Sequence, residues 1–583
     1  MPSTTALFTA MSGLNAYSRN IDVIGNNVAN IGTTAFKSSR LNFSSMFART
    51  LSGGTLPGDA TGGTNPFQIG LGVSTAGTQR TMTGGALSPT GDQRDLAIDG
   101  KGWFIVDRAG EQLYTRAGSF RTNALGELTT LGGERLLGYG VDENFNLVTG
   151  ALGTVSIPLG SMTIAESTSE VRFSGNLDAD AAVAAQGARV TIGGSSTAGL
   201  RALATAAPAP TLPNVLESAT RLLDVEDPAS AGAPLFSLGQ FIELRGAEKG
   251  GRTVPPASLA ITATTTIDDL STFLAQALGL NTTTGANPDG FTPGVTIDPL
   301  TGVITAVGNT GTANDLTIDS SDLRLLDSAG TLLRQPFVTG KAAEADGESV
   351  RTTYVVYDSL GAPVEVDTTL VLESRGNAGT TWRYYVESAD ATGVPIQVAT
   401  GTLSFDTQGQ AVSTLPVTVG IDRSGTGAAS PLAVNLYFST PEGGLTALAD
   451  DRSQFAATYR DGAPLGTLTA FSIGTNGVVS GIFTNDLVRT LGQVVVATFT
   501  NDEGLLDTGN GLFKSAANSG TAVVAQPGTL GTGQIIAGAL EQSNVDLGEE
   551  FIRLVLSSTG YSASSRVIRT TDELMQQLLV LGR

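Results

Sequence analysis

The chain has 583 residues, of which 40% are hydrophobic, and it carries a formal net charge of −21. This length accommodates several domains with packed cores, and the negative charge argues against binding to nucleic acid or to anionic membranes. The sequence has no cysteine and no histidine, which excludes disulfides, thiolate catalysis and the most common general base and transition-metal ligand. We therefore expect no enzymatic activity, no metal ion and no cofactor.

The N-terminal stretch from Leu7 to Ser39 has the apolar pattern of an amphipathic helix. Such a pattern, with apolar residues at alternating steps of three and four, is typical of a coiled-coil seam and calls for a partner helix. The residues of this seam are Leu7, Ala10, Leu14, Tyr17, Ile21, Ile24, Val28 and Ile31. Phe8, Met11 and Val23 lie off the seam, so the predicted helix is apolar on more than one face.

The same N-terminal stretch lacks the features of a secretory leader. Its first basic residue is Arg19, and it has no uninterrupted apolar core. Elsewhere no apolar run approaches the roughly 18 residues that a membrane-spanning helix requires. We expect neither a cleaved leader nor insertion into a membrane.

The C-terminal segment from Ala539 to Arg583 is the second predicted amphipathic helix. A column spaced by seven residues runs along it: Leu540, Leu547, Leu554, Tyr561, Ile568 and Met575. Ser543 is the predicted N-cap, and the low helix propensity around Gly560 predicts a bend or late ordering there. We expect this helix to pack on the N-terminal one. Because both helices carry apolar residues off their seams, lateral self-association is favoured over the alternative, an ordinary two-helix cap.

Between the two helices the sequence is rich in strand and turn signals. Residues 40–92 are rich in Gly, Thr and Pro and predict an extended connector, and 50–66 and 528–538 are candidate hinges. One internal helix is predicted over Thr264–Leu280, with Thr266 as its N-cap. Asn476 and Gly477 predict a tight hairpin turn, and the two tryptophans, Trp103 and Trp382, are predicted to anchor cores.

These signals predict a mainly β multidomain protein with long terminal α-helices that form an α-helical coiled-coil core, and with nested, discontinuous β-rich outer domains. The expected division has five parts. They are a terminal helical core (1–33 with 541–583), a connector (34–70), an inner β domain (71–158 with 448–540), a middle β domain (159–200 with 340–447) and an inserted outer domain (201–339).

Several stretches resemble the bacterial flagellar axial proteins of the rod and hook. ALFTAMSGLNAYSRNIDVIGNNVANIGTTAFKSSR is similar to the N-terminal signature of that family, and DLAIDGKGWFIV with LYTRAGSFRTNALGEL to its next block. GALEQSNVDLGEEFIRLVLSSTGYSASSRVIRTTDELMQQLL is similar to its C-terminal signature. YVVYDSLGAPVEV, GTLTAFSIGTNGVVSGIFTN and RTLGQVVVATFTNDEGLL resemble the hook branch in particular.

This resemblance implies a structural subunit that self-assembles into a curved hollow tube, a flexible universal joint that transmits motor torque to the filament. It implies an extracellular place in the flagellum, and export by the flagellar type III apparatus without a cleaved leader. The implied partners are further copies of the chain and the rod, hook-cap and hook–filament junction proteins. The residues expected to contact neighbouring subunits are Leu7, Leu14, Ile21, Asn26, Asn27, Val28, Asn30, Leu547, Leu554, Tyr561, Ile568 and Met575.

Two other functions stay open at this point. A distal-rod subunit of the same family would share the terminal signatures, although the length and the hook-like blocks favour the hook. A secreted β-rich adhesin would have to bind a ligand as a monomer. Residues 201–339 match no hook motif and are interpreted as an insertion at an outer surface.

Overall fold

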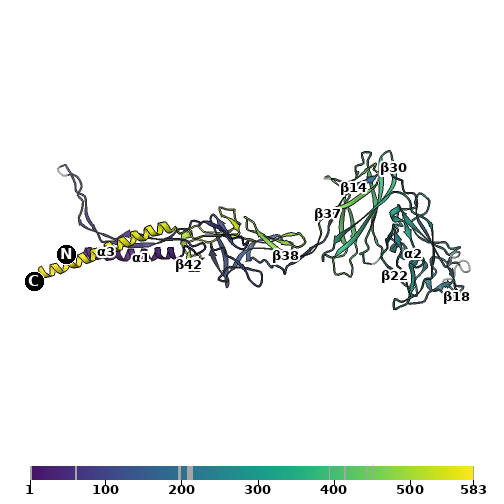
Figure 1. Cartoon of the computed structure of the whole chain (residues 1–583), viewed down its shortest axis with the longest axis horizontal. Coiled ribbons are helices and arrows are strands. Elements are labelled where there is room, and N and C mark those ends of the chain that lie inside the picture. The colour runs from purple at the N-terminus through teal and green to yellow at the C-terminus, as the bar shows by residue number, and fades with distance from the viewer. Residues whose placement is uncertain are drawn as a thin grey trace. The chain divides into compact units, whose positions relative to one another are not determined.

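The computed structural model describes residues 3–59, 62–194, 199–206, 215–392, 394–412, 415–441, 443–450 and 452–581. The chain divides into two compact units (Figure 1). Unit 1 consists of Met1–Thr163 and Thr467–Arg583, and unit 2 is Ile164–Gly466, inserted between the two parts of unit 1. Strands dominate both units, and no described helix is long and apolar enough to cross a bilayer.

The terminal helices of unit 1 are α1 (Ser3–Ala29) and α3 (Leu547–Leu581). Asp546, and not the predicted Ser543, caps α3, because its Oδ1 accepts hydrogen bonds from the backbone N–H groups of Gly548 (2.8 Å) and Glu549 (3.1 Å). The helix runs without interruption through Gly560, where a bend or late ordering was predicted. Packing against α1 overrides the low local helix propensity of this stretch.

The segment after α1, predicted to be an extended connector, forms two antiparallel ladders. β1 (Ser39–Ser45) pairs with β4 (Val73–Arg80), and between them β2 (Ala48–Ser52) pairs with β3 (Phe67–Gly70). The first ladder packs on α1, where the backbone N–H of Val73 donates to Ser12 Oγ at 3.1 Å and Arg19 Nη1 donates to Thr75 Oγ1 at 3.0 Å. Most of the second ladder is exposed.

The remainder of unit 1 is an antiparallel β domain, in which strands from before and after unit 2 pair with each other. Its main sheet follows the order β38-β39-β40-β11-β7-β8-β43-β42. Along the chain its strands are β7 (Trp103–Arg108), β8 (Glu111–Thr115), β9 (Arg121–Thr122), β10 (Leu128–Thr129), β11 (Arg135–Val141), β12 (Leu147–Thr154), β38 (Ala463–Ile473), β39 (Val478–Phe483), β40 (Val488–Val494), β41 (Val496–Thr498), β42 (Leu506–Gly509), β43 (Leu512–Lys514) and β44 (Val523–Ala525). A 3₁₀ turn, Asp502–Gly504, follows β41.

The predicted turn at Asn476 and Gly477 joins β38 to β39, with Gly477 at a φ of 80°, which confirms it. Trp103 is buried in the core of this domain, as predicted. Its ring meets that of Phe513 edge-on at 4.9 Å, and its Nε1 donates a hydrogen bond to Asp502 Oδ1 at 3.0 Å.

Two short ladders lead from the β domain to α3. β6 (Leu96–Asp99) pairs with β45 (Gln534–Ala537), and β5 (Leu87–Pro89) pairs with β46 (Ala539–Glu541). Ile535 of β45 is fully buried. The C-terminal part of the predicted hinge at 528–538 is therefore held in a ladder, because backbone pairing and burial fix β45 in place, whereas residues 528–533 before it form turns.

The described residues of unit 2 form two large hydrophobic cores and a small buried cluster of Ala184, Val371 and Tyr385. The first lies between the meander β29-β30-β31-β32 and a mixed sheet in which β14 pairs with β34, β36 and β37. Trp382 is fully buried here, as predicted. The strands are β14 (Glu170–Asp178), β29 (Ser349–Tyr357), β30 (Pro363–Gly376), β31 (Gly379–Glu387), β32 (Gln397–Phe405), β33 (Val417–Ile421), β34 (Leu432–Tyr437), β35 (Ser439–Thr440), β36 (Gly443–Leu448) and β37 (Gln454–Arg460). β13 (Thr163–Glu166) pairs instead with β38, at the edge of the main sheet described above.

The second core of unit 2 surrounds α2 (Ile267–Ala277). Thr266 caps this helix in a reciprocal capping box with Asp269, which confirms the predicted N-cap. The core includes residues that lie outside 201–339, among them Ala188, Val190 and Ile192 of β15, which pairs with β28, and Ala345. Its strands are β15 (Gly187–Gly193), β16 (Arg201–Ala202), β17 (Val225–Asp227), β18 (Ser230–Pro234), β19 (Phe241–Leu244), β20 (Glu248–Lys249), β21 (Arg252–Thr253), β22 (Ala257–Ala260), β23 (Gly294–Ile297), β24 (Ile304–Thr310), β25 (Leu316–Thr317), β26 (Leu323–Leu326), β27 (Leu332–Arg334) and β28 (Val338–Ala343), with 3₁₀ turns at Leu222–Asp224 and Thr312–Asn314.

Candidate functional site

The terminal helices α1 and α3 pack side by side, as the two apolar stripes predict, and they run antiparallel (Figure 1). Asn20 Nδ2 donates to Ser557 Oγ at 2.6 Å, and Asn27 Nδ2 donates to Glu550 Oε1 at 3.1 Å. The step of seven residues from Asn20 to Asn27 on α1 is thus matched by a step of seven from Ser557 back to Glu550 on α3. This register places the two ends of the chain in one helix pair.

The same register brings two glycines into close contact across the pair. A Cβ added at Gly13 would lie 3.0 Å from Ser564 Oγ, and one added at Gly560 would lie 2.5 Å from the Tyr17 ring. The other residues that α1 buries are mostly small or polar as well: Ala10, Ala16, Ile24 and Asn27. Those that α3 buries are Glu550, Ser557 and Thr571. The contact within one chain is therefore made largely by small and hydrogen-bonding side chains.

The large apolar side chains predicted to form the seam flank this contact. On α1 and in the turn that follows it, Leu7, Leu14, Ile21, Val28 and Asn30 are half-buried, Asn26 is exposed, and Asn27 alone of the predicted set is fully buried. On α3, Leu554 and Ile568 are half-buried, while Leu547, Tyr561 and Met575 are exposed. The buried column of α3 thus lies three residues C-terminal to the predicted column, at Glu550, Ser557 and Thr571.

Both helices present large apolar residues to solvent. Those of α1 are Phe8 and Met11, and those of α3 are Leu547, Phe551, Ile552, Val555, Leu556, Tyr561, Val567, Leu574, Met575, Leu579 and Val580. Ile552 and Leu556 retain 71% and 72% of their accessible surface. A continuous apolar face of this kind marks an interaction surface. We refer to the exposed residues from Phe551 to Leu556 as the apolar face of α3.

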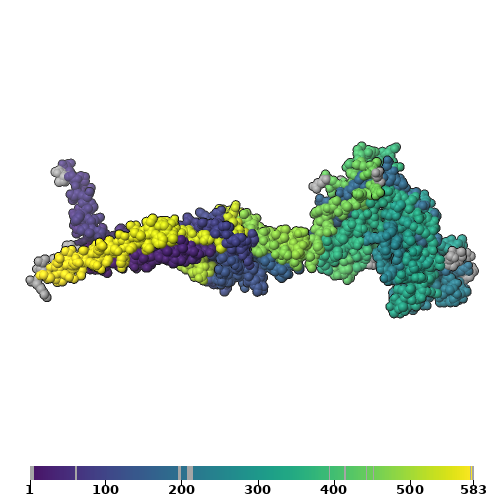
Figure 2. Space-filling model, in the orientation of Figure 1, coloured from purple at the N-terminus to yellow at the C-terminus, as the bar shows by residue number. Residues whose placement is uncertain are grey.

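The ladder formed by β2 and β3 is a second exposed apolar feature. It stands clear of the helix pair, as the dark purple arm in Figure 2 shows. Its apolar side chains are Phe47, Leu51, Leu56, Phe67 and Ile69, all exposed. A two-stranded hairpin is marginally stable on its own, so an arm of this kind gains most from packing against another surface.

A cavity of about 760 Å³ lies where the base of this arm meets the helix pair. Its walls come from α1, β2, β3 and α3, and include Ala6, Leu51, Ile69, Ala563 and Val567. The apolar lining suits an apolar side chain or a helix end rather than a polar ligand.

A buried ion-pair cluster joins the helix pair to the β domain of unit 1. Glu541, fully buried at the end of β46, accepts hydrogen bonds at its carboxylate from Lys37 Nζ (2.5 Å), Arg116 Nη1 (3.3 Å) and the backbone N–H of Gly85 (2.9 Å). Burial lowers the pKa of Lys37, and the charge of Glu541 partly offsets that shift. Burial likewise lowers the pKa of Arg116. Removing one partner would leave uncompensated charge in the interior.

Three further side chains, those of Asn27, Asn544 and Glu550, link this ion-pair cluster to the two helices. Asn27 is fully buried and also binds the backbone of Ser39, donating from Nδ2 to its carbonyl at 2.7 Å and accepting its N–H at 3.0 Å. Asn544 Oδ1 accepts the N–H of Ser38 at 2.7 Å, and its Nδ2 donates to the carbonyls of Thr81 (2.9 Å) and Thr83 (3.1 Å). Together with Glu550 these residues fix both helices on the segments that connect them to the β domain.

The sequence prediction missed this cluster. Its members come from residues 37, 85, 116 and 541, and no local pattern indicates that they meet. One signal for the cluster was Glu541, an isolated acidic residue in an apolar stretch shortly before α3. For the close contact between the helices, the signals were Gly13 and Gly560, which interrupt apolar helical stretches.

Four models of flagellar protein families match the chain in order. They are Flagella basal body rod protein over residues 7–37, Flagellar hook protein FlgE/F/G D1 domain over 97–176, Flagellar basal body protein FlaE D2 domain over 326–463, and Flagellar basal body rod FlgEFG protein C-terminal over 536–581. The first and last cover most of α1 and α3, the paired helices.

Relatives align with the chain over nearly its whole length. The flagellar hook protein FlgE of Treponema pallidum is 27% identical over 99% of both chains, and that of Caulobacter vibrioides is 27% identical over 100% of both. The hook protein FlgE of Salmonella typhimurium is 25% identical over 98% of both. The crystal structure of the Helicobacter pylori hook protein FlgE2 aligns with 78% of this chain and 100% of its own, at 17% identity and a TM-score of 0.38.

Paired terminal helices, an exposed apolar face and matches to rod and hook models at both ends define a structural axial protein of the bacterial flagellum. Within that class the chain belongs to the flagellar hook protein family.

Proposed function

We propose that the chain is the structural subunit of the flagellar hook and self-assembles into a curved hollow tube that acts as a flexible universal joint between motor and filament. The observation that carries this proposal is the apolar surface that α1 and α3 leave exposed in a single chain. Burying apolar surface is worth about 25 cal/mol per Å², so neighbouring copies that cover it gain a large driving force. A head-to-tail contact that does not close produces a helical polymer.

In this polymer the terminal helices of neighbouring copies form an α-helical coiled-coil core around a central channel. The large apolar residues that flank the contact within one chain supply the contacts between chains. They are Leu7, Leu14, Ile21, Val28, Leu547, Leu554, Tyr561, Ile568 and Met575, with Asn26 and Asn30 near the end of α1, whereas Asn27, also expected in this set, is fully buried within one chain. The arm formed by β2 and β3 packs on a further copy, which supplies the apolar partner that the isolated hairpin lacks.

The domain division that we propose is nested. Residues 1–33 with 541–583 form the core, 34–70 the connector, 71–158 with 448–540 the inner β domain, 159–200 with 340–447 the middle β domain, and 201–339 the inserted outer domain. This order is supported by unit 2 being inserted in unit 1 and by its two separate hydrophobic cores.

The same function implies partners and a location. The subunit is exported by the flagellar type III apparatus and acts outside the cell. It contacts the rod at one end of the tube and the hook-filament junction at the other, and the hook cap during growth. The chain has no catalytic role in this proposal, which is in keeping with a family of structural proteins.

Electron microscopy of the purified full-length chain at high concentration tests the function. Curved hollow tubes are the expected result. An Ile552→Asp/Val555→Asp variant places two charges on the apolar face of α3, where both side chains are exposed, so the monomer still folds but tubes do not form. A Leu530→Asp variant is the matched control, because Leu530 is 84% exposed in a loop of the β domain and lies outside the helices.

The other outcomes separate the alternatives. Straight, rigid polymers would assign the chain to the distal rod. Monomers that stay monomeric at every concentration, with or without preformed hook fragments as seeds, would favour an adhesin. Normal tubes from the Ile552→Asp/Val555→Asp variant would show that this face is not the interface.

A further inference from the structure

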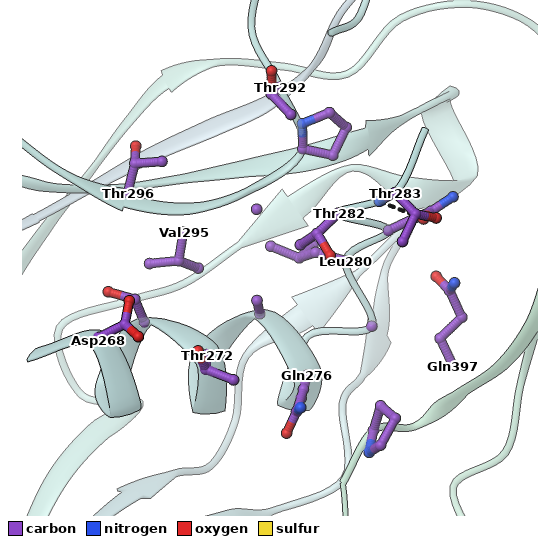
Figure 3. A pocket seen from close by; sticks show the side chains of 17 residues that line it. Asp268, Thr272, Gln276, Leu280, Thr282, Thr283, Thr292, Val295, Thr296 and Gln397 are labelled. Atoms are coloured by element: carbon purple, nitrogen blue, oxygen red, sulfur yellow. Dashed lines mark hydrogen bonds between the residues drawn. The ribbon is translucent and has the colours of Figure 1, made fainter. Parts of the chain in front are cut away.

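A cavity of about 520 Å³ opens in the second core region of unit 2, between α2 and β23 (Figure 3). One face of α2 forms its floor, with Asp268, Thr272 and Gln276. The loop after α2 and the residues leading into β23 form its walls, and Gln397 stands at the end opposite Asp268. The volume is in the range of sites that hold small organic molecules.

Buried polar side chains hold the loop that forms one wall. Lys249 Nζ and Asn309 Nδ2 both donate to the carbonyl of Gly279 at 3.0 Å, and Asn309 Oδ1 accepts the N–H of Asn281 at 2.9 Å. Asn281 Oδ1 in turn accepts from the backbone N–H (3.1 Å) and the hydroxyl (2.7 Å) of Thr283. Lys249, Asn281 and Asn309 are almost wholly buried, so this wall is rigid and its side chains are preorganised.

The cavity contains hydrogen-bonding groups that the protein itself does not use. The hydroxyls of Thr272, Thr282, Thr292 and Thr296 form no hydrogen bond with another described residue, and all four residues are exposed. Gln397 Oε1 is buried and has no hydrogen-bond partner among the described residues, so no contact fixes the orientation of this carboxamide. Hydroxyls and amides can each donate and accept, which matches a ligand that does both at several positions.

Charge and shape narrow the ligand class. Asp268 is the single ionisable side chain in the lining of this cavity, and no lysine or arginine lines it, which disfavours phosphates, sulfates and acidic sugars. Leu280, Pro293, Val295 and Pro395 add flat apolar surface beside the hydroxyls. A pyranose ring has both a C–H face and a rim of hydroxyls. We infer that this cavity is a binding site for a neutral saccharide of one or two rings.

Saturation-transfer NMR on the full-length chain tests this inference, with N-acetylglucosamine, galactose and methyl α-mannoside as probes and glucuronic acid as the anionic comparison. We expect saturation transfer to at least one neutral probe and none to glucuronic acid. A Thr272→Val/Thr296→Val variant removes two hydroxyls at constant volume and should weaken binding about tenfold. Thr402→Val is the matched control, because Thr402 is exposed on β32 and does not line the cavity.

Other results would overturn the inference. No transfer to any neutral probe at millimolar concentration would exclude the site, and undiminished binding by the Thr272→Val/Thr296→Val variant would place the sugar elsewhere. Binding of an extended Thr/Ser peptide with no saccharide signal would assign the cavity to a peptide, through the edge strand β23. If the Thr272→Val/Thr296→Val variant folds poorly, saccharide binding is measured instead for a Gln397→Ala variant that has the wild-type melting temperature. Weaker binding by this variant would support the site, and undiminished binding would contradict it.

Discussion

Gly560 lies so close to Tyr17 that no side chain fits between them: an added Cβ would come within 2.5 to 2.7 Å of three ring atoms. The contact joins residues near opposite ends of the chain, and glycine is the residue that permits it. Helix propensity alone would favour alanine at this position by about 1 kcal/mol. Alanine at position 560 is therefore expected to destabilise the protein if the two helices are paired in this register, and to stabilise it if they are not.

A Gly560→Ala variant should lower the free energy of unfolding of unit 1 by about 1–3 kcal/mol, because the Tyr17 ring must shift. Thermal melts followed by far-UV circular dichroism measure this change. Gly25→Ala is the control on the partner helix, since a Cβ there meets nothing within 4 Å and should stabilise by up to about 1 kcal/mol. Stabilisation by both substitutions would contradict the observed register.

A Glu541→Gln substitution leaves Lys37 and Arg116 in the interior without their shared counter-charge. We expect a loss of about 3–5 kcal/mol, measured by urea unfolding, and a smaller loss in the Lys37→Met/Glu541→Gln double variant. Lys514→Met is the control, because the Lys514–Glu111 pair is about half-exposed and should contribute less than about 1 kcal/mol. Equal effects at both pairs would mean that the Glu541 cluster is hydrated.

Tyr385, buried in unit 2, gives a prediction at alkaline pH. Burial raises its pKa to about 12, so the folded state retains a proton that the unfolded state loses near pH 10. Its contribution to stability is therefore complete below pH 10 and is lost as the pH rises toward 12. Burial also raises the pKa of Tyr354, so absorbance at 295 nm should show more than one late-titrating tyrosine, and the Tyr385→Phe variant should lose one of them. Titration of all tyrosines near pH 10 in the folded chain would contradict this burial.

The second core of unit 2 predicts where a deletion is tolerated. It contains Val190 and Ile192 of β15, which pair with β28, so removing 201–339 exposes an apolar sheet. Removing 186–346 with a short Gly/Ser linker takes out the whole core and should leave the meander β29–β32 folded. Limited proteolysis compares the two deletions. Greater protease resistance of the 201–339 deletion would instead place the domain boundaries at 201 and 339, with β15 belonging to the middle β domain.

Local signals predicted the elements that depend on a few adjacent residues. Thr266 and Asp269 specify the start of α2, and Asn476 with Gly477 specifies the turn before β39. The sequence also predicts the pairing of α1 with α3, because each helix has an apolar stripe. Periodicity does not say which face turns inward when a helix is apolar on several sides, so the seam was assigned to the larger residues.

The joint around Glu541 depends on contacts that span most of the chain. Lys37 and Glu541 are 504 residues apart, and their meeting follows from the ladder of β5 with β46. The strands within 40–92 were also missed, because Gly, Thr and Pro are typical of turns, whereas the pairing of β1 with β4 is decided by packing on α1.

The small and polar seam between α1 and α3 has a consequence for how the sequence can change. Folding of one chain draws on glycine contacts and buried hydrogen bonds, while in the proposed polymer association of chains draws on the apolar residues that remain outside. Substitutions in one set alter one process with little effect on the other. Variation can thus adjust the stiffness of the assembled polymer residue by residue without eroding the stability of the subunit from which it is built.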